Sequence, residues 1–261
     1  MSRLAFHVGI DYEGSDSELF GCENDAYNMK KLTKDILGYK DENIMMMTDN
    51  TPNKPTHENI MKHLHLMADR THTEKIKELF ITYSGHGAPL HDTNGDESDK
   101  KDECIIPIDY KKSGYIKDDD IHTVLSKINE NVKVIVLIDA CHSGTMLDLR
   151  YVAGDKFFTE NAKCSVKCDC VMISGCLDSQ LSMDTYNFNN SGKYSGAMSS
   201  AFLLVLERFK YNIGFWPLLK NMLKVLSSKG FKQKPQITCS RQLSISSLFM
   251  AVGSAPFVSN E

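Results

Sequence analysis

Residues 132–144, VKVIVLIDACHSG, constrain the fold more than any other part of the chain. Apart from Lys133, the first half of this segment is apolar and rich in Val and Ile, which is typical of a strand buried on both faces of a sheet. The run then breaks into a polar turn that carries a single thiol, Cys141. In open α/β sheets, ligands bind beyond the carboxyl ends of the strands. We therefore expect Cys141 to lie at the functional edge of a sheet.

A second apolar run ends in the same way. Residues 78–84, ELFITYS, lead directly into Gly85, His86 and Gly87. If the two runs form neighbouring parallel strands, their carboxyl ends bring an imidazole and a thiol to the same edge of the sheet. An imidazole beside a thiol is the usual means of activating cysteine for acyl transfer. The two glycines would also allow a substrate backbone to approach His86 closely.

Cys141 also has a simpler interpretation, because cysteine is among the most buried residue types and often acts as a small hydrophobic side chain. Its position after the acid Asp139 and beside Ser143 and Gly144, outside the apolar run, favours catalysis. We expect the neighbouring His142 to be a surface residue.

Composition and charge exclude several classes of protein. The chain has 261 residues, of which 41% are hydrophobic and 25% charged, and this ordinary globular composition can bury a core. A net charge of −4 gives no general attraction to nucleic acid or to acidic membranes. No apolar stretch approaches the length of a membrane span, and we expect neither membrane association nor a signal peptide. Eight cysteines in such a chain indicate reduced thiols and a cytoplasmic location.

Strand-like and helix-like segments alternate along the chain. We predict strands over residues 4–12, 44–47, 76–84, 132–140, 170–175 and 237–240, and helices over 22–37, 56–69, 118–127, 197–211 and 215–228. Residues 148–169 are expected to form a mixed loop. The alternation favours a mainly parallel sheet that is covered by helices on both faces. With no internal repeat or linker, residues 1–261 are expected to form a single domain.

Several motifs resemble those of type I metacaspases, which are caspase-like cysteine peptidases. They are GCENDA at residues 21–26, YSGHG at 83–87, DECIIPID at 102–109, YIKDDDI at 115–121, DACHSGTMLDL at 139–149, ISGCLDSQ at 173–180, GAMSSAFL at 196–203 and KQKPQITCS at 232–240. The resemblance implies a caspase-like three-layer α/β sandwich with a central, mostly parallel β-sheet. As a departure from the family, no proline-rich or zinc-finger segment precedes the first predicted strand, so we expect no separate prodomain.

The resemblance also implies an activity, namely hydrolysis of peptide bonds after Arg or Lys. The residues that match the catalytic pair of the family are His86 and Cys141. The backbone N–H groups of Gly87 and Cys141 would stabilise the oxyanion. Caspases have Gln before the Ala-Cys pair, whereas this chain has Asp139. The expected partners are protein or peptide substrates, with no nucleic acid and no membrane, and the chain is expected to be a monomer.

Four residues match the specificity pocket of that family, namely Cys22, Asp25, Ser84 and Asp139. Two carboxylates that face one guanidinium or ammonium group would favour a basic side chain, because a single ion pair at 4 Å is worth about 4 kcal/mol at an effective dielectric constant near 20. As an alternative, Asp25 caps a helix and Asp139 is simply solvated.

A set of aspartates suggests a calcium site. Asp118 and Asp119 belong to an acidic run that opens a predicted helix, where acids are also favourable partners of the helix dipole. Oxygen-rich clusters suit a hard cation such as Ca²⁺. The resemblance implies that Asp102, Asp118, Asp119 and Asp148 bind calcium, and we expect the cation to order the loop after Cys141.

Two other functions stay open from the sequence. One is a catalytically silent caspase-like scaffold that binds partners. The other is a zinc-binding module formed by Cys164, Cys168, Cys170 and Cys176, although their spacing is not a usual zinc pattern. If the chain cleaves itself, the candidate sites are Arg150, Lys156, Lys163 and Lys167.

Overall fold

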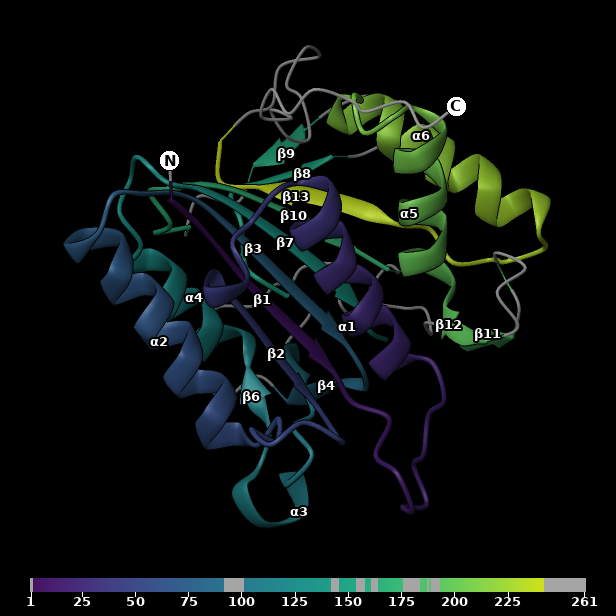
Figure 1. Cartoon of the computed structure of the whole chain (residues 1–261), viewed down its shortest axis with the longest axis horizontal. Helices are drawn as coiled ribbons and strands as arrows, with labels where there is room; N and C mark the ends of the chain where they lie inside the picture. The colour runs from purple at the N-terminus through teal and green to yellow at the C-terminus, as the bar shows by residue number, and fades with distance from the viewer. Residues whose placement is uncertain are drawn as a thin grey trace.

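A twisted β-sheet forms the centre of the computed structural model (Figure 1). The structure describes residues 2–91, 101–141, 146–153, 158–160, 164–175, 184–186, 188 and 193–241. Within these ranges the main sheet has eight strands in the order β2-β1-β3-β7-β10-β13-β8-β9. Their bounds are β1 Ser2–Gly9, β2 Ile44–Thr48, β3 Ile76–Ser84, β7 Lys133–Asp139, β8 Tyr151–Ala153, β9 Phe158–Glu160, β10 Asp169–Ser174 and β13 Gln236–Cys239.

The five strands from β2 to β10 in this order run parallel, whereas β13, β8 and β9 are antiparallel to their neighbours. The prediction of a mainly parallel sheet is therefore confirmed. The apolar run before Cys141 is β7, whose residues after Lys133 are all buried. It lies next to β3, and Ser84 pairs with Asp139 at their carboxyl ends.

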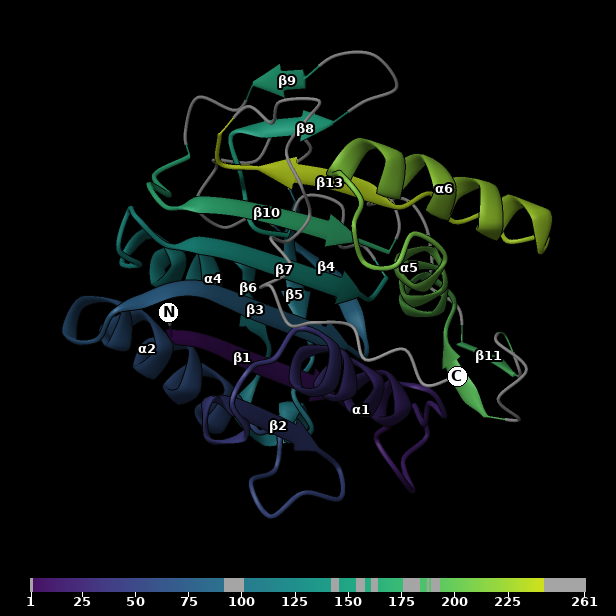
Figure 2. The same ribbon diagram turned by 45° about the horizontal axis from the view of Figure 1, so that its top comes forward.

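Helices cover both faces of the sheet (Figure 2). One face carries α2 (His57–Thr73) and α4 (Asp118–Ser126), and the other carries α1 (Cys22–Lys31), α5 (Ala197–Arg208) and α6 (Phe215–Ser228). Successive side chains of a strand point to opposite faces. In β3, Leu79 and Ile81 accordingly join the core under α2 and α4, whereas Phe80 joins the core under the other helices. The result is the predicted three-layer α/β sandwich.

The helix predicted over residues 22–37 is present but changes type partway. After α1 the chain continues as a π-helical turn, η1 (Leu32–Ile36). In this turn the Thr33 hydroxyl donates to the Met29 carbonyl oxygen at 3.0 Å and lies 3.0 Å from Nε2 of the buried His7. A hydroxyl that bonds to the carbonyl of the preceding turn commonly bends or distorts a helix.

Several short elements have no counterpart in the sequence-based predictions. They are η2 (Asp41–Asn43), β4 (Gly87–His91), α3 (Tyr110–Ser113), β6 (Ile116–Lys117), β11 (Asp184–Tyr186) and β12 (Tyr194–Gly196). The sequence also indicates a short extended segment over residues 104–108, and β5 (Lys101–Ile105) overlaps it in part. The loop predicted over residues 148–169 is wrong in part, because β8 and β9 lie within it and extend the main sheet. Strands of three residues are too short to show an alternating pattern in the sequence.

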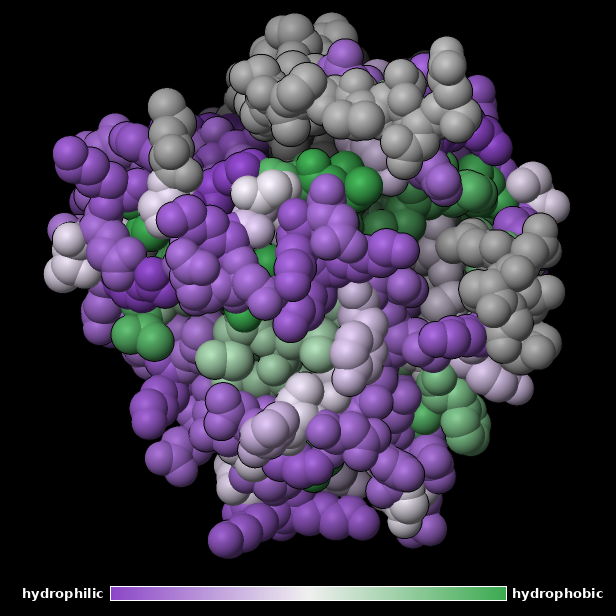
Figure 3. Space-filling view, in the orientation of Figure 1, coloured by the Kyte–Doolittle hydropathy of each residue, from purple (hydrophilic) through white to green (hydrophobic). Residues whose placement is uncertain are grey.

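The surface seen in Figure 3 is mostly hydrophilic, and its apolar residues form scattered patches. The large hydrophobic side chains that are exposed among the described residues are Phe20, Tyr27, Ile36, Leu66, Tyr115, Tyr194 and Phe209. Among these, Phe20 and Tyr194 pack against each other, with 5.5 Å between ring centroids. Exposed apolar residues in such small groups are normal on a protein surface. Within the described ranges, the helices are too short or too polar to cross a membrane.

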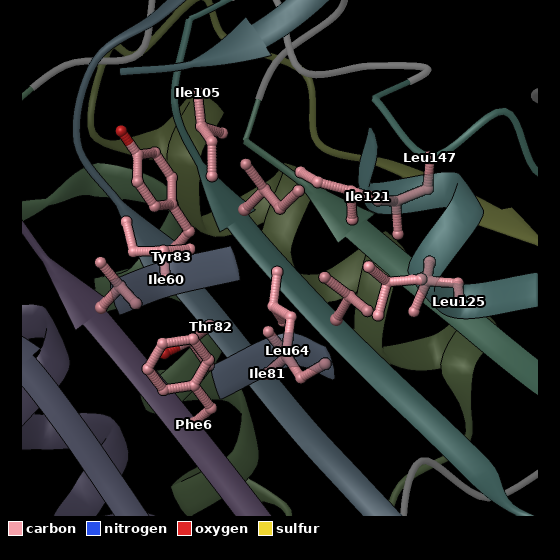
Figure 4. A pocket seen from close by; sticks show the side chains of 14 residues that line it. Phe6, Ile60, Leu64, Ile81, Thr82, Tyr83, Ile105, Ile121, Leu125 and Leu147 are labelled. Atoms are coloured by element: carbon pink, nitrogen blue, oxygen red, sulfur yellow. The ribbon is translucent and has the colours of Figure 1, made fainter. Parts of the chain in front are cut away.

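A small apolar cavity lies between the sheet and the layer of α2 and α4 (Figure 4). Its volume is about 40 Å³. Phe6 contributes to its sheet side, and Leu64 and Leu125 contribute from the helices, while Tyr83 and Leu147 line it near the carboxyl ends of the strands. An apolar cavity of this size stays dry. We interpret it as imperfect packing of the core.

Candidate active site

The carboxyl ends of β3 and β7 bring the predicted catalytic segments together. Because Ser84 and Asp139 are paired, His86 and Cys141 each follow a paired residue by two positions. The Gly85 N–H group also donates to the Asp139 carbonyl oxygen at 3.4 Å. The two turns thus leave the same edge of the sheet side by side, as the sequence predicts.

Gly87 allows the backbones of these two turns to approach closely. A Cβ atom at this position would overlap with the Cys141 carbonyl oxygen and would lie 3.2 Å from Cβ of Ala140. Only glycine fits such an approach without displacing the backbone. Cys141 is half-buried at this junction, whereas His142 lies outside the described residues.

The imidazole of His86 is half-buried and is oriented by two contacts. Its Nε2 atom lies 2.8 Å from the Ser17 carbonyl oxygen. Its ring packs on the ring of Tyr12, with 4.8 Å between ring centroids. When Nε2 carries the proton that it donates to Ser17, Nδ1 is the basic nitrogen. Ser17 could not be identified from its residue type, because it contributes a backbone carbonyl oxygen.

Three of the four predicted pocket residues, Asp25, Ser84 and Asp139, lie close together at the carboxyl ends of β3 and β7. Asp25 and Asp139 are buried, with exposed fractions of 2% and 4%. The Ser84 hydroxyl donates to Oδ2 of Asp25 at 2.7 Å. Oδ2 of Asp25 also accepts from the Gly196 N–H group at 2.9 Å. The alternative in which Asp139 is merely solvated is wrong, because its carboxylate is buried.

Asp139 contacts the first turn of α5. Its Oδ2 atom accepts from the Ser199 N–H group at 2.8 Å. The positive end of a helix dipole stabilises a carboxylate in this position. A Cβ atom on Gly196 would overlap with Oδ2 of Asp139 and would lie 2.7 Å from Oδ2 of Asp25. Gly196 therefore separates the two acids, a role that its sequence position did not indicate.

Cys22, the fourth predicted pocket residue, is the first residue of α1 and is buried. Its N–H group donates to Oδ1 of Asp11 at 2.8 Å. It lies one helical turn before Asp25, whose N–H group donates to the Gly21 carbonyl oxygen at 3.0 Å. The start of α1 thus supplies both residues to the same end of the sheet.

The predicted calcium ligands come from three segments. Asp118 opens α4 and is buried, and its Oδ2 atom accepts from the Glu103 N–H group at 2.6 Å. Its Oδ1 atom accepts from the Asp119 N–H group at 2.8 Å. Asp102 lies beside Glu103 in β5, and its side chain is outside the described set. Asp148 has a left-handed backbone, with a φ of 47°.

Among the side chains that the structure describes, no three His, Cys, Asp or Glu residues are arranged to hold a metal ion. The bond between Asp118 and Glu103 nevertheless joins the start of α4 to β5, so three of the four acids, Asp102, Asp118 and Asp119, lie on adjoining segments. Carboxylate oxygens are also the donors that Ca²⁺ prefers. The chemistry of the donor set therefore fits calcium.

The late cysteines are poor zinc ligands. Cys164, Cys168 and Cys170 are all buried, and Cys176 lies outside the described residues. Burial raises the pKa of Cys168 to about 12 and raises that of Cys170 well above its ordinary value. Zinc binds the thiolate form, which this environment disfavours.

Two of the four candidate self-cleavage residues lie within the described ranges. Arg150 is half-buried and its guanidinium donates to the Cys164 carbonyl oxygen at 3.4 Å. Lys167 is exposed, and its carbonyl oxygen accepts from Arg241 at 2.5 Å. Lys156 and Lys163 lie outside the described residues.

The fold defines a class of protein, since the arrangement of strands and helices matches solved structures along almost the whole chain. A crystal structure of a protein from Geobacter sulfurreducens aligns with a TM-score of 0.68 and 22% sequence identity, and covers 95% of this chain and 97% of that chain. The structure of pro-sf-caspase-1 aligns with a TM-score of 0.55 and 15% identity, over 91% of this chain and 90% of that one. The chain has a caspase-like fold.

Sequence comparison gives the family within that class. The model of the metacaspase, peptidase C14 domain matches residues 3–150. Metacaspase-1 of Cryptococcus neoformans is 32% identical over 301 residues, covering 95% of this chain and 64% of the relative. Metacaspase-1 of Kluyveromyces lactis is also 32% identical, over 95% of this chain and 68% of the relative. The chain belongs to the metacaspase family, and spans about two thirds of the length of these relatives.

Proposed function

We propose that this metacaspase is a calcium-dependent cysteine endopeptidase that hydrolyses peptide bonds after Arg or Lys, with His86 and Cys141 as its catalytic pair. The observation that carries the proposal is the junction of the two turns after β3 and β7. There Ser84 pairs with Asp139, and Gly87 abuts the backbone of Cys141. An imidazole and a thiol on adjoining turns are the minimum needed for acyl transfer through cysteine.

In this mechanism His86 moves protons and Cys141 forms the covalent bond. With Nε2–H donated to Ser17, Nδ1 takes the thiol proton and the Cys141 thiolate attacks the scissile carbonyl carbon. The N–H groups of Gly87 and Cys141 stabilise the oxyanion. The imidazolium then protonates the departing amine and leaves a thioester. Water, deprotonated by Nδ1, hydrolyses this thioester and releases the Cys141 thiolate.

The proposed preference for Arg or Lys rests on Asp25 and Asp139. Their buried carboxylates are each held by a backbone N–H group at the end of β12 or the start of α5. Buried charges are strongly destabilising unless they are compensated, and a substrate guanidinium or ammonium group supplies a positive charge. The Ser84 hydroxyl donates to the same oxygen of Asp25 as the Gly196 N–H group does.

The proposed calcium dependence rests on the acids of β5 and α4. Asp102, Asp118, Asp119 and Asp148 would hold the ion. Bound Ca²⁺ would neutralise the repulsion among these carboxylates. Asp118 already joins β5 to α4 through Glu103, and Asp148 lies on the segment that follows the catalytic turn. When Ca²⁺ draws these four acids together, the segment that carries Asp148 would shift toward the conformation that is competent for catalysis.

We further propose a cytoplasmic location and a monomeric state. Eight cysteines fit a reducing compartment, and the scattered exposed apolar residues fit a monomer. Sedimentation of the purified chain tests the second point, and a single species of twice the chain mass would contradict it.

The test of the proposed function is turnover of fluorogenic peptides with Arg, Lys or Asp before the cleaved bond, with and without calcium. We expect cleavage of the Arg and Lys peptides only, in the presence of calcium. Cys141→Ala and His86→Ala should each abolish turnover while the protein stays folded. A folded wild-type protein that cleaves none of these peptides would instead favour a partner-binding scaffold.

A further inference from the structure

Two buried tyrosines hold the backbone of His86 from both sides. Tyr12 follows β1 and Tyr83 lies near the end of β3, and their exposed fractions are 3% and 5%. The His86 N–H group donates to the hydroxyl oxygen of Tyr12 at 3.0 Å. The Tyr83 hydroxyl donates to the His86 carbonyl oxygen at 2.7 Å. Both polar backbone atoms of His86 are therefore fixed by side chains.

The same hydroxyl groups fasten His86 to the chain just after β5. The Tyr12 hydroxyl donates to the Ile106 carbonyl oxygen at 2.6 Å. The Ile106 N–H group in turn donates to the His86 carbonyl oxygen at 3.2 Å. The two hydroxyl oxygens are 3.2 Å apart. With the ring of Tyr12 also packed on the imidazole, this network restrains both the backbone and the ring of His86.

Two backbone features adapt the chain to this network. Tyr12 has a φ of 53°, in the left-handed region that non-glycine residues rarely occupy. Such strain persists only where the surroundings hold the residue in place, and it concentrates at functional sites. A Cβ atom on Gly85 would lie 2.7 Å from the Tyr83 hydroxyl oxygen and 3.1 Å from that of Tyr12. The residue before His86 must therefore be small.

The hydroxyl groups also keep their protons. Burial raises the pKa of Tyr12 and of Tyr83 well above the ordinary value for tyrosine. Both groups stay neutral throughout the physiological range, so each retains a hydrogen to donate. The network is then insensitive to pH where a cysteine peptidase works.

We propose that Tyr12 and Tyr83 are positioning residues for His86, which set the imidazole at the distance and angle that proton transfer with Cys141 requires. This inference rests on the proposed peptidase function. Displacement of a catalytic group by about 1 Å can cost roughly 100-fold in rate. Loss of either hydroxyl should therefore reduce turnover much more than it reduces substrate binding.

The chain offers a matched control in Tyr39. This tyrosine is also buried, with an exposed fraction of 4%. Its hydroxyl donates to Oε1 of Glu78 at 2.6 Å, near the opposite end of β3. Tyr39→Phe therefore removes a buried hydroxyl and a short hydrogen bond without touching His86.

The experiment compares Tyr12→Phe, Tyr83→Phe and Tyr39→Phe in the full chain. We expect kcat on an Arg peptide to fall roughly 10- to 100-fold in the first two variants, with little change in KM. Tyr39→Phe should retain the wild-type kcat even if its Tm falls as far as the Tm of the other two variants. Equal kcat in all three variants, or losses that only follow Tm, would overturn the proposal.

A second readout does not depend on peptide cleavage. The rate of Cys141 alkylation by iodoacetamide, followed by mass spectrometry across pH, reports how the thiol is coupled to His86. Tyr12→Phe should shift this pH profile and Tyr39→Phe should not; an unshifted profile would overturn the positioning role even in a protein that cleaves no peptide. If neither tyrosine variant folds, Gly85→Ala provides a second test, because its methyl group would press against both hydroxyl groups and disturb their bonds to His86.

Absence of peptide cleavage by the wild-type protein would refute the proposed function alone. The alkylation profiles would still decide whether the tyrosines position His86.

Discussion

Asp139 contacts both the turn that carries His86 and the proposed pocket, the first through its carbonyl oxygen and the second through its carboxylate. Its carbonyl oxygen accepts from Gly85, next to His86. Its carboxylate accepts from Ser199 at the start of α5. Because Cys141 follows two residues later, one aspartate influences the position of the proposed nucleophile, of the turn that carries His86 and of the proposed pocket. Substitution of its side chain should therefore affect substrate recognition while the backbone contacts remain.

We predict that Asp139→Asn lowers kcat/KM for Arg peptides roughly 100- to 1000-fold, because an ion pair of about 4 kcal/mol is lost and each 1.4 kcal/mol is tenfold. The amide keeps the size of the side chain and an acceptor for Ser199. The measurement is peptide turnover, with Asp41→Asn at an exposed site as the control. Unchanged kcat/KM in Asp139→Asn would refute the acidic pocket.

At the scale of elements, β5 and α4 connect the predicted calcium ligands to the active site. Asp118 holds the N–H group of Glu103 in β5. Ile106, just beyond the end of this strand, bonds to the carbonyl oxygen of His86. A change in the position of β5 should therefore move the backbone of His86, the proposed catalytic histidine.

Calcium should switch activity on without holding the fold together. We predict that Asp119→Asn raises the calcium concentration needed for half-maximal turnover at least about tenfold, since one charged ligand is lost. Asp120→Asn, at the exposed next position of the same helix, is the control. Mg²⁺ should substitute poorly, because it requires tight octahedral geometry. Full activity in excess chelator would contradict the calcium dependence. The circular dichroism spectrum of the calcium-free protein should equal that of the calcium-bound protein, because the fold does not depend on the ion.

The cavity between the sheet and the layer of α2 and α4 gives a prediction about stability. Val136 of β7 lines this cavity, whereas Val134 of the same strand does not. We expect Val136→Ile to raise the free energy of unfolding by about 0.5–1 kcal/mol, because one methylene group fills empty space. Val134→Ile should lower it by about 1–3 kcal/mol through overpacking. Urea denaturation measures the free energy of unfolding of both variants. If the two substitutions changed it equally, the space beside Val136 would not be empty.

At the scale of the whole molecule, the fold should weaken in acid because of buried histidines. Burial lowers the pKa of His7 to about 3 and that of His63 to about 4. In the unfolded chain both should titrate near 6.5. The unfolded chain then binds more protons below that pH, so the free energy of unfolding falls as the pH drops, by up to about 1.4 kcal/mol per pH unit for each group.

We predict that His7→Gln makes the free energy of unfolding less dependent on pH between about pH 6.5 and pH 4. Glutamine cannot titrate, and its amide retains partners in Thr33 and Thr82. Urea denaturation at several pH values gives the slope of the free energy of unfolding against pH. A loss of stability that is the same at every pH does not change this slope. A slope equal to that of the wild type would show that His7 is not the group responsible.

The strands that carry the active site were predictable because they are long apolar runs. The apolar run rich in Val and Ile predicts a strand over residues 132–140, and this strand is present as β7. The short strands β8 and β12 were missed, because three residues give no periodic signal. The contributions of Ser17 and Ser199 were also missed, since backbone atoms act in both and any residue type supplies those.

We propose Cys141 as a nucleophile that is activated by His86 and lies beside a pocket for a basic side chain. The most direct measurement is labelling with a peptidyl-arginine chloromethyl ketone in calcium, followed by peptide mapping. We predict labelling at Cys141 in the wild-type protein and no label at position 141 in Cys141→Ala. In His86→Ala, Cys141 should be labelled much more slowly than in the wild type. Labelling of a different cysteine would show that Cys141 is not the nucleophile. Faster labelling by the corresponding peptidyl-aspartate chloromethyl ketone would show that the pocket does not select a basic side chain.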